Sequence, residues 1–161
     1  MLPFFEVGIN DQIPLLFREF QDGHPVVDPC VVDRQCAWKV LNTYLKQAVP
    51  YGDAKPGAVV AIQSFGDFQN FHPHLHVLST DGCFYSDGAF MVCPAPKTAD
   101  LEELFRYEVF KMLKEEGKIN DTVIENMLTW HHSGFNIYCG NAIWPHNEEG
   151  LENLARGTCP P

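Results

Sequence analysis

The chain has 161 residues, of which 45% are hydrophobic, so it can build one domain with a substantial core but not a second large one. Its formal net charge of −10 argues against a stand-alone nucleic-acid binder, because recognition of a phosphate backbone normally needs a surplus of lysine and arginine. No apolar run is long enough to span a membrane, and the first residues lack the pattern of a signal peptide, so we expect a cytoplasmic protein with no membrane partner.

The amino-terminal part of the chain has little regular pattern. Residues 1–32 contain several prolines, and their apolar residues keep neither a helical nor a strand period for long, so we expect a poorly ordered segment. From Asp33, which can cap a helix, apolar residues recur at three- and four-residue spacing as far as Ala48, and Pro50 ends the pattern. This stripe predicts a helix that packs against a sheet.

Two apolar stretches carry polar residues that can act together. Residues 58–65 read as a buried strand with one uncharged polar side chain, Gln63, near its end. Residues 73–78 form a second apolar run with His74 and His76, which point to the same side of an extended strand because successive side chains alternate. If the two strands pair antiparallel across the turn between them, Gln63 faces the two histidines.

Two imidazoles and an amide oxygen on one sheet face can bind a divalent cation. This mixture of ligands suits Mn²⁺ or Mg²⁺ with water positions left open, so Gln63, His74 and His76 form a predicted metal site. Histidines that only pack or hydrogen-bond, beside a glutamine at a strand end, are the alternative. A cupin-like metal-binding oxygenase is a second alternative, because Asp81 follows the histidines; its place before Gly82 also marks a turn.

The remaining pattern completes a mixed fold. Turn signals at Asp81-Gly82 and at residues 86–88 predict a short hairpin. Apolar stripes predict helices over residues 100–116 and from about residue 121, and residues 134–139 alternate as a last strand. We therefore expect an α+β domain, a mostly antiparallel sheet with helices packed chiefly on one face. The two helices fit poorly with the strand-built barrel of a cupin.

Several stretches of the sequence carry a family resemblance, and they stand in the expected order and spacing: residues 56–68, 72–78, 80–84, 130–136 and 151–156. Together they resemble the core of the HUH transposases of the insertion-sequence-91 type. The resemblance covers residues 33–156 and implies an HUH endonuclease-like palm. This core would lie between the poorly ordered segment, residues 1–32, and an aberrant tail, residues 157–161.

The resemblance implies an enzyme of DNA transposition that nicks single-stranded DNA and transfers the strand. In such an enzyme a divalent cation held by the histidines, Mn²⁺ or Mg²⁺, polarises the scissile phosphate while a tyrosine attacks it and forms a 5′-phosphotyrosine. The resemblance also places His131 and His132 near the active site, where one of them would contact a phosphate. A histidine pair satisfied by nearby backbone carbonyls is the alternative.

Two parts of the family pattern have no counterpart in this sequence. The resembling transposases carry a cysteine-rich zinc-binding segment upstream of the core, whereas the six cysteines here form no Cys-x-x-Cys pair. Their nucleophilic tyrosine directly follows an Asn-Leu-Ala-Arg block, after which this chain has Gly157. We therefore expect a transposase-derived fragment that is inactive in nicking and binds single-stranded DNA weakly. An inert or partner-binding remnant without catalysis is the alternative.

Overall fold

The computed structural model describes residues 3–9, 29–65, 71–140, 143–144 and 146–155. Strands and helices follow one another in the order β1 (Phe4–Ile9), α2 (Pro29–Gln47), β2 (Lys55–Phe65), β3 (Phe71–Tyr85), β4 (Ala89–Val92), α3 (Thr98–Glu115), α4 (Asp121–Leu128), β5 (Phe135–Cys139) and α5 (Glu148–Ala155). None of the helices in these ranges has the length and apolar character needed to cross a membrane.

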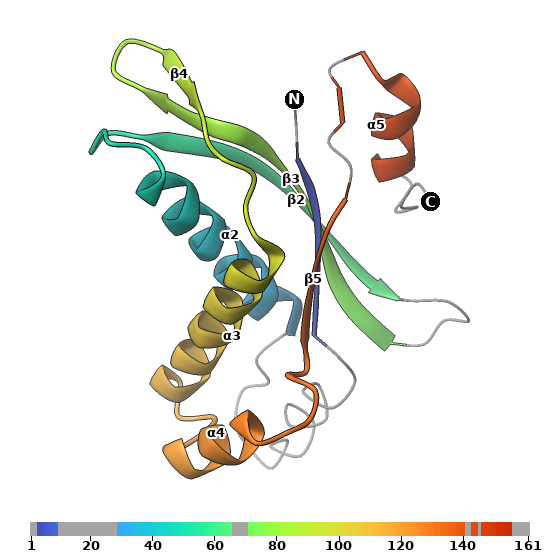
Figure 1. Ribbon diagram of the computed structural model, residues 1–161. Helices are drawn as coiled ribbons and strands as arrows, with labels where there is room; N and C mark the ends of the chain where they lie inside the picture. The colour runs from blue at the N-terminus through green and yellow to red at the C-terminus, as the bar shows by residue number, and fades with distance from the viewer. Residues whose placement is uncertain (1–2, 10–28, 66–70, 141–142, 145, 156–161) are drawn as a thin grey trace.

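The five strands form one antiparallel sheet, which confirms the predicted α+β fold. The order of the strands is β2-β3-β1-β5, and β4 pairs with the carboxyl-terminal end of β3. Figure 1 shows α2 and α3 on the same side of this sheet, with α4 following at the end of α3. β3 is therefore the central strand, with β2 along one edge and β1 and β4 along the other.

Alternation along the strands gives the sheet a buried face, which packs on α2 and α3, and an opposite face, which we term the open face. On the buried face, Leu75 and Val77 of β3 have 0% exposure and share one core cluster with Phe105 and Val109 of α3. Phe135 of β5 adds an edge-to-face contact with Phe105, at 5.9 Å between ring centroids. Burial of each such side chain contributes roughly 1.5–3 kcal/mol. This cluster therefore fixes which residues of β3 point toward the helices and which point to the open face.

The amino-terminal segment contains a strand where the sequence predicted poor order. Within residues 1–32, β1 lies between β3 and β5, and residues 29–32 belong to α2. Residues 10–28, and the predicted tail at residues 157–161, lie outside the described part of the chain. The expectation is wrong for β1 because Phe5 and Val7 are buried in the core cluster, by strands and helices that are distant in the sequence.

β3 continues through the predicted turn at Asp81-Gly82 and reaches Tyr85. The chain reverses instead at the second predicted turn, where φ is positive at Ser86 (46°) and at Gly88 (94°). This turn is closed by the Gly88 N–H, which donates to the Tyr85 carbonyl at 3.3 Å. The prediction was wrong at Gly82 because a backbone carbonyl of β4 occupies the space that a side chain there would fill.

Two of the helices begin earlier than predicted. α2 begins at Pro29 and not at Asp33, which agrees with the preference of proline for the first helical position. α3 begins at Thr98, where no side chain caps the helix. The start of α4 is confirmed, because Asn120 Oδ1 accepts a hydrogen bond from the Val123 N–H at 3.0 Å.

The close approach of β4 to β3 leads to a test of the sheet. An ideal Cβ at Gly82 would lie 1.9 Å from the Met91 carbonyl oxygen, so Gly82→Ala should push the strands apart and lower the free energy of unfolding by about 1–3 kcal/mol. Gly52→Ala is the matched control, because nothing lies within 4 Å of the added Cβ. Urea unfolding measures both variants. Equal stability of the two would contradict the pairing of β3 with β4.

Candidate metal centre

Polar side chains from three neighbouring strands lie on the open face of the sheet. His74 and His76 project from β3, and Gln63 of β2 lies opposite His74 in the strand pairing. On the other edge of β3, Glu6 of β1 lies opposite His76, and Gly8, which has no side chain, lies opposite His74. The predicted antiparallel pairing, which turns Gln63 toward the histidines, is therefore confirmed, although the turn itself lies outside the described residues.

The predicted ligands are brought together. His76 Nε2 and Gln63 Oε1 are 3.0 Å apart, and the ring centroids of His74 and His76 are 5.0 Å apart. Both histidines are buried, with exposures of 7% and 4%. Because an amide oxygen only accepts hydrogen bonds, His76 carries a proton on Nε2 in this arrangement. The same nitrogen and oxygen could both bind a cation only in the other neutral tautomer, in which the proton lies on Nδ1 and Nε2 offers its lone pair.

The surroundings of His76 favour its neutral form. Burial lowers the pKa of this histidine below its ordinary value of 6.5, the neighbouring His74 lowers it further, and Glu6 raises it by a smaller amount. A neutral imidazole offers a lone pair to a metal ion, whereas an imidazolium does not. Imidazole nitrogens and amide oxygens are ligand types that divalent cations accept.

The candidate third ligand beside the two histidines is an amide, Gln63. Among the described residues, no three histidine, cysteine, aspartate or glutamate side chains gather in a group that could hold a metal ion. Glu6 faces His76 across the strand pair, but it does not join the two histidines in such a group. The candidate centre therefore depends on Gln63.

A comparison with known families identifies the class of protein. Residues 57–159 match the model of the family described as "Putative transposase", which is more than half of the 161-residue chain. The chain belongs to this transposase family. No curated protein and no solved structure matches the chain. The match confirms the prediction from the sequence that the chain belongs to the transposases and has a function related to transposition.

The chain carries further polar side chains on the open face that the sequence did not connect with the histidines. Asn136 and Tyr138 of β5 lie opposite Gly8 and Glu6 of β1, so that one cross-strand row reads His76, Glu6, Tyr138. Tyr138 is 56% exposed. The alternation of apolar residues over β1 was the available signal. It could have predicted a strand, but not which strands lie beside it.

Among the described residues of the chain, no hydrogen bond, ion pair or ring contact joins His131 or His132 to the candidate metal centre. Both histidines are exposed between α4 and β5, and their ring centroids lie 4.7 Å apart. The same loop is tied to α3, because Ser133 Oγ donates to Glu102 Oε1 at 2.9 Å. α3 packs on the buried face of the sheet. The phosphate contact expected for one of these histidines stays a prediction.

Asp81 points away from the histidines. It lines a cavity of about 220 Å³ together with Leu45 of α2 and with Cys93, both of which pack on the buried side of the sheet. The described sheet also has an open order, with β2 and β5 at its ends, and is not a closed barrel. The cupin-like alternative, with Asp81 as the partner of the two histidines, is therefore wrong.

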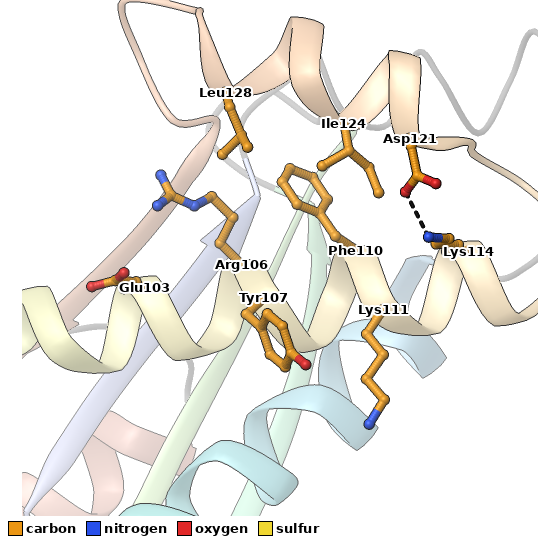
Figure 2. A pocket seen from close by; sticks show the side chains of 9 residues that line it. All are labelled: Glu103, Arg106, Tyr107, Phe110, Lys111, Lys114, Asp121, Ile124 and Leu128. Atoms are coloured by element: carbon orange, nitrogen blue, oxygen red, sulfur yellow. Dashed lines mark hydrogen bonds and ion pairs between the residues drawn. The ribbon is translucent and has the colours of Figure 1, made fainter.

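A larger cavity of about 420 Å³ lies between α3 and α4 (Figure 2). Figure 2 shows Phe110 pointing from α3 toward Ile124 of α4, and Arg106 extending from α3 on the side of Leu128. An ion pair between Lys114 and Asp121 joins the two helices at its edge. Among the residues that the structure describes, no histidine or cysteine lines this cavity, and α3 packs on the buried face of the sheet. It is therefore a feature of the helix packing and not part of the candidate metal centre.

The contact between His76 and Gln63 can be tested in the metal-free chain. Gln63→Met keeps the size of the side chain but removes the acceptor for His76 Nε2–H, so the free energy of unfolding should fall by about 1–3 kcal/mol. Gln63→Glu keeps an oxygen acceptor and should retain most of the stability. Urea unfolding at neutral pH with a chelator present measures both. An equal loss in the two variants would mean that the hydrogen bond contributes nothing.

Proposed function

We propose that the chain is the core of an HUH transposase of the insertion-sequence-91 type, which acts on single-stranded DNA in transposition. The observation that carries this proposal is the contact between His76 Nε2 and Gln63 Oε1 beside His74, which places three side chains able to bind a metal ion on one face of the sheet. The transposase family supplies the class of process. The five resembling stretches of sequence support the HUH type within that class.

The proposed centre holds Mn²⁺ or Mg²⁺ through His74, His76 and Gln63, with further positions left to water and substrate. A cation bound there would polarise the scissile phosphate and spread the charge that develops on it. The contribution of the chain is to prepare the ligands. Burial lowers the pKa of His76, which favours its neutral form, and the buried residues on the other face of β3 hold both imidazoles in place.

The group that attacks the phosphate is not found at its expected place. By resemblance the nucleophilic tyrosine would stand at residue 157, which is Gly157 here and lies outside the described residues. Tyr138 lies on the open face, whereas the other tyrosines stack on each other or lie on α2 and α3. Tyr138 is held in a strand, with β1 between it and His76. We therefore propose that this chain by itself does not nick DNA.

Manganese binding tests the proposed centre. Saturating Mn²⁺ should raise the midpoint of thermal unfolding, because a ligand that binds only the folded state stabilises it by about 2.7 kcal/mol at a hundred times its Kd. His74→Ala should lose the shift. His132→Ala should keep the shift, because this histidine is exposed and its ring packs against His131 and not against the centre. The absence of any shift in the unmodified chain would favour the alternative of a remnant without catalysis.

Incubation with Mn²⁺ and single-stranded DNA tests the missing nucleophile. The oligonucleotide is labelled at its 3′ end, because a 5′-phosphotyrosine would keep the 3′-side fragment attached to the protein. We expect no covalent protein–DNA band on denaturing electrophoresis. A band that disappears in Tyr138→Phe would contradict this expectation and identify Tyr138 as the nucleophile.

A further inference from the structure

The open face of the sheet carries an exposed aromatic pair in addition to the candidate metal centre. Phe84 of β3 pairs with Lys55 of β2 on one side and with Phe90 of β4 on the other, so the three side chains form one cross-strand row. Cys83, the residue before Phe84, is buried in a cluster with Leu45 of α2. Because strand side chains alternate, Phe84 and its two partners point to the face opposite α2.

These side chains are available to a ligand. Phe84 and Phe90 are 49% and 39% exposed, and their ring centroids lie 4.8 Å apart. Val92, the residue of β4 opposite Gly82, is also exposed on this face. Lys55 is exposed and forms no ion pair with any residue that the structure describes. A group of exposed apolar side chains beside a lone cation is typical of an interaction site and not of an ordinary solvent-facing strand.

The chemistry of the row matches an unpaired nucleotide. Base faces stack on aromatic side chains, and an ammonium group pairs with a neighbouring phosphate. In a duplex the base faces are covered by one another, so only a single strand can offer them. The net charge of −10 gives the chain no general attraction for phosphate backbones. Stacking on the exposed rings is the interaction that remains to hold a strand.

We infer that Lys55, Phe84 and Phe90 form an aromatic platform that binds unpaired bases of single-stranded DNA. The inference rests on the proposed function, because the strand held here would be the one whose phosphate reaches the candidate metal centre. Phe84 lies eight residues along β3 from His76, a distance of about 26 Å in an extended strand. The platform therefore holds the strand several nucleotides away from the scissile phosphate and sets its position on the face.

A second copy of the chain is the competing occupant of this platform. Exposed apolar side chains also promote self-association. The net charge of −10 opposes a second copy and DNA alike, and a second copy could also bring a carboxylate to Lys55, so charge does not separate the two occupants. A single strand offers base faces to the rings and a phosphate to Lys55 together, and the match to a transposase family makes DNA the expected partner, so the observations favour DNA.

Fluorescence anisotropy with a labelled single-stranded oligonucleotide tests the platform, with EDTA present so that no cation contributes. Phe84→Ala should weaken binding at least about fivefold, the effect of losing one stacked base, and Phe84→Tyr should retain it. Tyr107→Ala is the matched control, because Tyr107 is a 61% exposed aromatic residue on α3 and should leave binding unchanged. The same sequence as a duplex should bind more weakly than the single strand.

The outcomes separate this inference from the proposed function. If manganese stabilises the chain but Phe84→Ala and Tyr107→Ala bind the single strand alike, the platform is wrong and the metal centre stands. If manganese has no effect but Phe84→Ala still weakens binding, the platform stands and the proposed function fails. Sedimentation compares the oligomeric state of the unmodified chain with that of Phe84→Ala. A dimer that dissociates in the variant without loss of DNA binding would show that a second copy covers the platform, and would overturn the inference.

Discussion

The buried face of β3 is the constraint on which the rest of the structure depends. Leu75 and Val77 have no exposed surface, and because side chains alternate along a strand, their burial directs His74 and His76 to the opposite face. A slip of one residue would turn both imidazoles into the core and both aliphatic side chains outward. The loss would be several kcal/mol, a large part of the stability of a small domain. The candidate metal centre and the aromatic platform both follow from this register.

The same alternation explains how much the sequence could predict. The pairing of β2 with β3, and with it the place of Gln63 opposite His74, follows from two local patterns joined by a short connection. β1 could not be placed in this way, because its partners β3 and β5 lie far along the chain. Its own alternation covers only six residues in a segment rich in proline. The row from His76 through Glu6 to Tyr138 could therefore not be predicted from the sequence.

Predictions from short sequence motifs were also wrong or incomplete where tertiary packing gives the same residue types another role. An Asp-Gly pair has the chemistry of a turn, but at Gly82 the missing side chain gives the Met91 carbonyl of β4 room to approach β3. Residue type alone does not distinguish these two uses of glycine. His131 and His132 are a related case, because the structure ties their loop to α3 through Ser133, a contact that their position in the sequence could not reveal.

The place of β1 in the strand order has a consequence for how the domain is made. Among the described strands, β5 joins the sheet only through β1. During synthesis β1 leaves the ribosome first, yet its two edges can be paired only after residues 71–85 and then residues 135–139 have emerged. Contacts of such large sequence separation form slowly, and an unpaired apolar strand can pair incorrectly before its own partner strands have been synthesised. The open face, with its histidines, is therefore complete only when nearly the whole domain has been synthesised.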